Sequence, residues 1–196
     1  MANTNAPFGF RQYSGTGSAP TYEQVSVLIA STDTTACFFG DPVTPLTSGY
    51  VTRASSSSAS GNTPIAGIFV GCQYLSVAQK RTVWSNYWPG SDVASTDTVT
   101  GYIINDPNAK FVAQFGNVAV DQGYVNSGVG FNIGTGSTTN GISGAYLATL
   151  ATDNTMPFKV VSLVTDPPGV NGTAAGAYQK AIVAFNNVST KQLTGV

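Results

Sequence analysis

Hydrophobic residues in this chain fall in short runs rich in β-branched and aromatic side chains, and Gly, Pro, Asn or Asp separate the runs. Runs of this length and composition are typical of β-strands bounded by turns. The predicted strands cover residues 24–30, 36–39, 50–54, 65–75, 99–105, 110–115, 129–133, 158–164 and 181–185. Helical patterns are weak, because only 145–151 and 118–125 could each form a turn or two.

The Gly, Pro, Asn and Asp residues between the runs favour turns for a physical reason. Proline fixes φ, and glycine or asparagine accepts positive φ, so Gly40-Asp41-Pro42 and Asn105-Asp106-Pro107-Asn108 are predicted turns, as is Asp166-Pro167-Pro168-Gly169. The low-complexity stretches 55–60 and 134–144 are predicted loops. The pattern therefore predicts an all-β fold, with short antiparallel strands in a barrel or sandwich and long loops.

Residues 1–20 show neither a helical nor a strand period, and they are predicted to form an extended N-terminal arm. The arm carries Phe8, Phe10, Arg11 and Tyr13, which is unusual for a free tail, because free tails are normally polar. We expect it to dock on a neighbouring molecule or on its own core, to bind a partner through these four residues, and to add little stability. The rest, 21–196, is predicted to be one β domain, with two structural subunits near 21–104 and 105–196.

Charge is scarce: the 196 residues include 8 Lys and Arg, 9 Asp and Glu and no His, so the net charge is −1. A nucleic-acid-binding surface needs a basic patch, and eight scattered cations do not supply one. A Ser-His-Asp triad and a histidine metal site are excluded. The glycine pairs Gly128-Val129-Gly130 and Gly134-Thr135-Gly136 lack the remainder of a phosphate-binding motif. We expect no enzymatic activity, no cofactor and no bound metal.

Cys37 and Cys72 each lie in an apolar run, so both are predicted to be buried free thiols. The N-terminus has no basic start followed by an apolar stretch, which predicts that it is not a signal peptide. No apolar run is long enough for a membrane span. These features predict a protein that is made in a cytoplasm and has no membrane partner.

An aromatic cluster, Trp84, Tyr87 and Trp88, lies beside Lys80 and Arg81 in the stretch 76–98, which interrupts the strand pattern and is predicted to be a long, exposed excursion. Trp and Tyr are enriched at protein interfaces, so an interface is the first interpretation. Packing in the core and stacking on a sugar ring both stay open as alternatives.

A series of turn-rich motifs resembles structural proteins of tailed bacteriophages. The motifs are MANTNAPFGF at the start, GDPV at 40–43, GI-V-G at 67–71, NDPNAKF at 105–111, PFKVV at 157–161 and FNN…QLTGV at 185–196. The resemblance implies a virion component, most like a capsid decoration (cement) protein made in the host bacterium and located on the capsid surface. It also implies a β-tulip-like unit over the GDPV…GIFVG stretch. The implied partners are the major capsid protein and neighbouring copies of the chain itself.

The physical profile fits a cement protein, because low charge lets many copies lie close together on a shell without strong repulsion. An extended arm can also add a strand to a neighbouring sheet. The competing hypothesis is a tail- or fibre-associated carbohydrate-binding module that uses Trp84, Tyr87 and Trp88 as a stacking platform. A virion hydrolase would need a facing pair of carboxylates.

Overall fold

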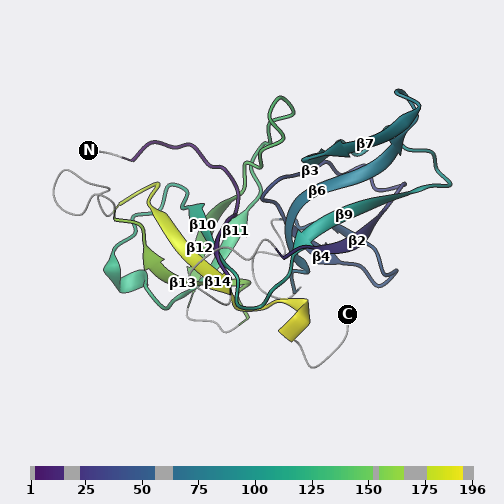
Figure 1. The fold of residues 1–196 in the computed structure, drawn as a ribbon. Coiled ribbons are helices and arrows are strands. Elements are labelled where there is room, and N and C mark those ends of the chain that lie inside the picture. The colour runs from purple at the N-terminus through teal and green to yellow at the C-terminus, as the bar shows by residue number, and fades with distance from the viewer. Residues whose placement is uncertain (1–2, 16–22, 56–63, 152–154, 166–175, 192–196) are drawn as a thin grey trace.

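The computed structural model describes residues 3–15, 23–55, 64–151, 155–165 and 176–191 of the chain. Within these residues nearly all regular structure is antiparallel β-sheet, which confirms the all-β fold class. Figure 1 shows two groups of strands side by side, one formed by sheet A and the other by sheet B, with the chain crossing between them after β9.

Sheet A has six strands in the order β1-β10-β14-β13-β11-β12, and every neighbouring pair is antiparallel. Its strands are β1 (Arg11–Ser14), β10 (Lys110–Gln114), β11 (Gly128–Asn132), β12 (Tyr146–Ala151), β13 (Phe158–Leu163) and β14 (Lys180–Phe185). An isolated parallel bridge joins Phe115, just after β10, to Leu147 in β12, so the sheet curls and its edge strand β12 approaches the end of β10 near the opposite edge. The described strands form no closed barrel.

Sheet B follows the order β2-β9-β6-β4-β5, and β7 pairs with the distal part of β6. Its strands are β2 (Val25–Ala30), β4 (Pro42–Pro45), β5 (Val51–Arg53), β6 (Gly67–Ser76), β7 (Arg81–Ser85) and β9 (Thr98–Ile104). The ten-residue β6 is the central element, because β4 pairs with its first residues and β7 with its last. A two-stranded ladder of β3 (Cys37–Phe38) and β8 (Tyr87–Trp88) completes the strands. The described helices are single 3-10 turns, η2 (Gln122–Tyr124) and η3 (Ser189–Lys191).

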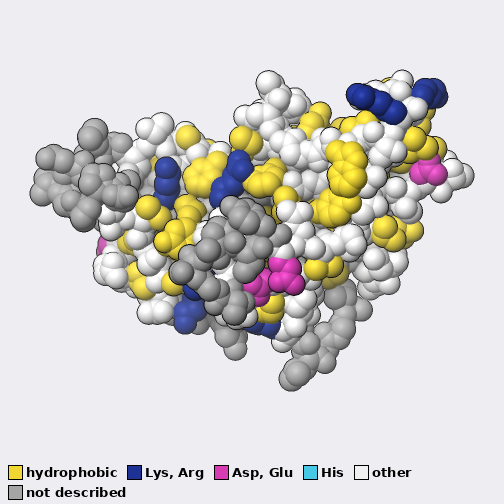
Figure 2. Space-filling model, in the orientation of Figure 1, with side chains coloured by type: hydrophobic (Ala, Val, Ile, Leu, Met, Phe, Trp, Pro, Cys, Tyr) yellow, Lys and Arg dark blue, Asp and Glu magenta, His cyan; other side chains and the backbone are white. Residues whose placement is uncertain are grey.

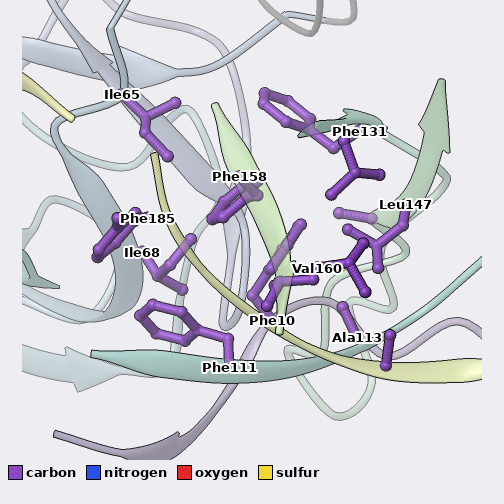
Figure 3. Packing of buried hydrophobic residues seen from close by; sticks show 14 of the residues in the cluster. Phe10, Ile65, Ile68, Phe111, Ala113, Phe131, Leu147, Phe158, Val160 and Phe185 are labelled. Atoms are coloured by element: carbon purple, nitrogen blue, oxygen red, sulfur yellow. The ribbon is translucent and has the colours of Figure 1, made fainter. Parts of the chain in front are cut away.

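The larger hydrophobic core belongs mainly to sheet A and is built from phenylalanine rings. Phe10 stacks on Phe158 at a centroid distance of 4.4 Å, and Phe158 in turn stacks on Phe185 at 5.7 Å. Figure 3 shows these rings together with Ile65 and Ile68, which enter the same cluster from the sheet B half of the chain. A second core lies on the inner face of sheet B, around the buried Trp88.

The two cores meet inside one strand. In β6, Ile68 packs with the phenylalanines of the larger core, whereas its neighbour Phe69 packs with the second core, because successive side chains of a strand point to opposite faces. All strands of sheet B come from residues 25–104, and those of sheet A come from 110–185 together with β1. Apart from β1, the strands of the two sheets therefore divide between β9 and β10, and the larger core includes residues from both sides of this point.

Two expectations need correction. The stretch 145–151 is strand β12 rather than a helical turn, because pairing with β11 outweighs the helix preference of its alanine and leucine residues. The stretch 76–98 contains the turn of the β6–β7 hairpin, strand β7 and strand β8, so it does not interrupt the strand pattern. Residues 118–125 do contain a single turn, η2. Residues 134–144 connect β11 to β12 without a strand of their own, as predicted for a loop. The predicted loop at 55–60, from residue 56 on, and the turn at 166–169 lie outside the described residues.

Candidate functional site

The N-terminal residues predicted to bind a partner are largely committed to the protein's own fold. Phe10 is only 1% exposed and lies at the centre of the larger core, which corrects the expectation that it is free for a partner. The guanidinium of Arg11 lies 4.3 Å from the centre of the Phe39 ring, and partial burial lowers its pKa. Phe8 is half-buried, with the Lys180 ammonium 5.7 Å from its ring centre. Of the four, only Tyr13 is well exposed, at 51%.

Hydrogen bonds fix this segment in place. The backbone N–H of Phe10 donates to the carbonyl of Gly40 (3.0 Å), and that of Gly9 donates to Ala145 (3.2 Å). The side chain of Gln114 accepts from Ala6 N–H (2.9 Å) and donates to the carbonyl of Thr4 (2.8 Å). Strand β1 then pairs with β10 at the edge of sheet A. Of the two docking modes left open by the sequence, the segment therefore adopts the one on its own core.

The predicted aromatic cluster is divided between two environments. Trp88 is fully buried; its indole N–H donates to the carbonyl of Asp33 (3.3 Å), and Tyr74 packs edge-on against it at 5.2 Å. Tyr87 is half-buried and stacks on Phe38 at 5.5 Å. Only Trp84 projects into solvent, with 67% of its surface exposed. Trp88 is thus a core residue, and the expectation that it contacts a partner or a sugar is wrong.

Trp84 belongs to a continuous outer face of sheet B, opposite the face that packs the second core. Strand pairing places one row of residues across four neighbouring strands β2, β9, β6 and β7: Leu28, Thr100, Gln73 and Trp84. Leu75 and Tyr102 flank this row on β6 and β9, at the alternate positions that share its face. Leu28, Leu75 and Trp84 are all exposed. We call these six residues the outer face of sheet B.

A shallow pocket of about 370 Å³ opens on this face. Its walls include Trp84 and Tyr102, whose rings are nearly parallel, with centroids 5.7 Å apart, and the hydroxyl of Tyr102 donates to Gln73 Oε1 (3.3 Å). Gly71 also lines the pocket; a Cβ atom there would lie 2.8 Å from the carbonyl oxygen of Ser85, so the close approach of the end of β7 requires glycine.

The electrostatic character of this pocket is neutral. Its described lining residues carry amide, hydroxyl, thiol and apolar groups, and none of them is charged. The nearest cationic pair in the sequence, Lys80 and Arg81, lies at the turn of the β6–β7 hairpin. On the side of the molecule drawn in Figure 2, hydrophobic and uncharged polar side chains cover most of the sheet B half, and its Lys and Arg side chains gather at one corner. A partner for the outer face would therefore be recognised by shape and apolar contact.

The side chains that could bind a metal ion are not clustered among the described residues, and the two cysteine thiols that could act as nucleophiles are buried. Among the described residues no cluster of three or more His, Cys, Asp or Glu side chains could hold a metal ion. Cys37 and Cys72 are free and buried, and burial raises the pKa of both thiols, that of Cys72 to about 12. Within the described chain, no helix is long and apolar enough to cross a membrane.

Sequence reasoning missed Leu28, Gln73, Leu75, Thr100 and Tyr102 as members of one surface. The alternation Thr98-Val99-Thr100-Gly101-Tyr102 does signal a strand with one polar face and one buried face. The alternation does not determine which residues lie beside Thr100 in the sheet. Its position between Leu28 and Gln73 depends on the register of pairing with strands that are distant in sequence.

Comparisons with protein-family models, curated proteins and solved structures find no match for this chain.

Proposed function

We propose that this protein is a virion structural protein that binds the surface of an assembled bacteriophage capsid and stabilises the shell without catalysing a reaction. The observation that carries the proposal is the outer face of sheet B, where Trp84, Leu28 and Leu75 are exposed on a rigid sheet that bears no charge along the row. The phage-like motif series in the sequence supports the same class of protein.

Attachment through this face would be driven by burial of apolar surface. An exposed tryptophan surrounded by smaller neutral side chains has the composition of an interface hot spot, where Trp is enriched and the neighbouring contacts exclude water. Covering a large apolar side chain that is otherwise exposed to water contributes more favourable free energy to binding than covering a small one. A net charge of −1 also permits close spacing of many copies on a lattice.

Binding to the assembled shell alone stabilises it by mass action, by about 2.7 kcal/mol per site when the free protein is at 100 times its Kd. Because the contact surface is neutral, the affinity should change little between low salt and about 1 M salt, where the Debye length is near 3 Å. This salt behaviour separates apolar docking from attachment through charges.

The test mixes the purified protein with capsids that lack it, then measures co-sedimentation and the release of DNA on heating. We expect salt-resistant binding and a higher release temperature. Trp84→Ala should weaken binding by about 2 kcal/mol or more, roughly thirty-fold, while Tyr13→Ala, an exposed aromatic away from this face, should bind as the parent does. Capsids that fail to retain the protein, or that gain no heat resistance at full occupancy, would refute the proposal.

The second candidate is a carbohydrate-binding module built on the same aromatic cluster. It has lost most of its support, because Trp88 is buried and Tyr87 is covered by Phe38, but the stacked pair Trp84 and Tyr102 beside a neutral pocket still favours it. Failure to bind capsids together with glycan binding that Trp84→Ala abolishes would move this function to first place.

A further inference from the structure

A second neutral hollow lies in sheet A, away from the outer face of sheet B. Two pockets of about 580 and 240 Å³ share Gly116, Asn117 and Tyr146, so they meet at these residues. The larger one falls in the range of about 300–1,000 Å³ that is usual for small-molecule sites. We call this hollow the tyrosine groove; the side chains that define it are Tyr124, Tyr146, Tyr178, Asn5, Asn117 and Asn132.

Glycines give the groove its shape. A Cβ atom on Gly116 would lie 2.7 Å from the ring of Tyr146, so only glycine lets that ring rest against the backbone at this point. A Cβ atom on Gly134 would lie 2.4 Å from the carbonyl oxygen of Gly144, so the two ends of the β11–β12 connection also approach closely because both lack side chains. The groove is therefore built from fixed backbone, and its rings have defined positions.

Tyr178 supplies an independent sign of a functional site. It has φ of +60°, a left-handed conformation that a bulky side chain rarely adopts and that costs conformational energy. Two hydrogen bonds hold it there: its N–H donates to the carbonyl of Gly116 (3.0 Å), and its carbonyl accepts from the Gln114 side chain (3.1 Å). Strain of this kind concentrates at ligand-binding positions, and here it directs a tyrosine into the wall of the groove.

The chemistry of the lining suits a ligand with apolar faces and a hydroxylated rim. None of the described residues that line the groove is charged, so neither an anion nor a cation finds a counter-charge. Tyr and Asn together are the residues that antibody combining sites use, the rings for rigid contact area and the amides for adaptable hydrogen bonds. The amide of Asn132 donates to the Tyr146 hydroxyl (3.5 Å), while Asn5 and Asn117 are exposed to solvent.

A sugar ring has the matching properties, because its C–H faces pack on flat rings while its hydroxyls bond to amides and phenols. We propose that the tyrosine groove binds a neutral oligosaccharide. The proposal does not depend on capsid binding, since the groove shares no residue with the outer face of sheet B. On a virion it would let a capsid-bound protein hold glycans as well.

The experiment titrates the full-length protein with maltohexaose, cellohexaose and a β-1,4-linked N-acetylglucosamine tetramer, using calorimetry and saturation-transfer NMR. A galacturonic acid oligomer serves as the charged comparison. We expect at least one neutral sugar to bind with a Kd of about 1 mM or tighter, and the charged oligomer to bind at least tenfold more weakly. A panel in which no neutral sugar binds at 10 mM would overturn the proposal.

Two variants locate the site. Tyr178→Gly removes the ring and relieves the backbone, because glycine adopts positive φ freely, so the fold should be retained while sugar binding falls at least tenfold. Asn117→Ala, an exposed amide, should also weaken binding. Tyr13→Ala and Trp84→Ala, exposed aromatics elsewhere, should bind as the parent does. Binding that is lost in Trp84→Ala but kept in Tyr178→Gly would place the site on sheet B and overturn this assignment.

Discussion

Asp41 is a carboxylate that the fold encloses where the two halves of the chain meet. It is 1% exposed, accepts a hydrogen bond from Phe38 N–H (2.8 Å) and another from the Ser143 hydroxyl, whose oxygen in turn accepts from Ala145 N–H (2.9 Å). Burial raises the pKa of Asp41, and the two hydrogen bonds and the charge of Arg53 offset this only in part. The bonds thus connect the GDPV turn to the loop that leads into β12, at the cost of a desolvated charge.

The raised pKa predicts the direction of a pH dependence. The folded state binds the Asp41 proton more tightly than the unfolded state, so this contribution to stability is complete below the unfolded-state pKa and is lost as the pH rises through the folded-state pKa. In Asp41→Asn the amide oxygen can accept from Phe38 and the NH₂ can donate to Ser143, so we expect a folded protein without this decline. Urea unfolding from about pH 4 to pH 8 measures it.

Asp41→Ala is the companion variant. It leaves the Phe38 N–H and the Ser143 hydroxyl without their acceptor, and we expect a loss of about 1–3 kcal/mol in unfolding free energy. An Asp41→Asn protein with the parental pH slope would show that another group controls the pH dependence.

The two thiols give a second test at the level of single residues. Burial raises the pKa of Cys37 and Cys72, so little thiolate forms near neutral pH, and neither sulfur is accessible to a reagent. We expect iodoacetamide at about pH 8 to leave the native protein unmodified and to modify both cysteines after unfolding in urea. Mass spectrometry of protein that was never reduced checks this, and a disulfide between them would contradict the observed free thiols.

Among the elements, the N-terminal segment departs furthest from what its sequence suggests. Its polar residues and missing period led us to expect an arm that could be removed at little cost in stability. That expectation is corrected by Phe10, which stacks on Phe158 and packs edge-on against Phe131 in the core. Strand β1 and the preceding residues form an integral part of sheet A.

Phe10→Ala is therefore expected to lower the unfolding free energy by about 3–5 kcal/mol, as for other fully buried phenylalanines. Tyr13→Ala, only three residues away and exposed, should change it by no more than about 0.5 kcal/mol. Chemical denaturation of the two variants gives both values. Equal small effects would mean that the segment is held only by its surface contacts.

The elements that could be predicted from sequence are those whose own residues determine them. The run Gly-Ile-Phe-Val-Gly-Cys gave β6, and the Asp-Pro turn at 105–108 correctly separated β9 from β10; the turn predicted at 40–42 does follow β3, but strand β4 (Pro42–Pro45), which begins at its proline, was not predicted. Strand β12 was missed because alanine and leucine favour helix locally, and β1 because Arg-Gln-Tyr-Ser has no hydrophobic alternation. The predicted aromatic cluster is divided because its side chains depend on strand pairing. Trp84 and Trp88 are close in sequence, but the pairing of β7 with β6 turns Trp84 outward, and the pairing of β8 with β3 places Trp88 in the core.

At the scale of the molecule, the two sheets share their stabilising contacts. Ile65, Ile68 and Ile104 come from the sheet B half of the chain, yet they pack in the core beneath sheet A, and Val188 bridges back to Ile65. We therefore expect one cooperative unfolding transition for the whole protein, with equal calorimetric and van't Hoff enthalpies. Ile68→Ala should lower the melting temperature of both halves together, as followed by near-ultraviolet circular dichroism and by thiol exposure. Two separated transitions would show that the halves fold independently.

The inclusion of the N-terminal residues in sheet A also determines when the contacts of this sheet can form during translation. Asn3 bonds to Gln179 through its side chain across 176 residues of sequence. At about 5–20 residues per second on a ribosome, its partner is made roughly 9 to 35 s later. The rings that Phe10 packs against, Phe131 and Phe158, are made 121 and 148 residues after it, so for most of that time a nascent chain holds Phe10 without them. Sheet A is therefore completed only after β14, its last strand along the chain, has been made, and shorter nascent chains lack the complete sheet.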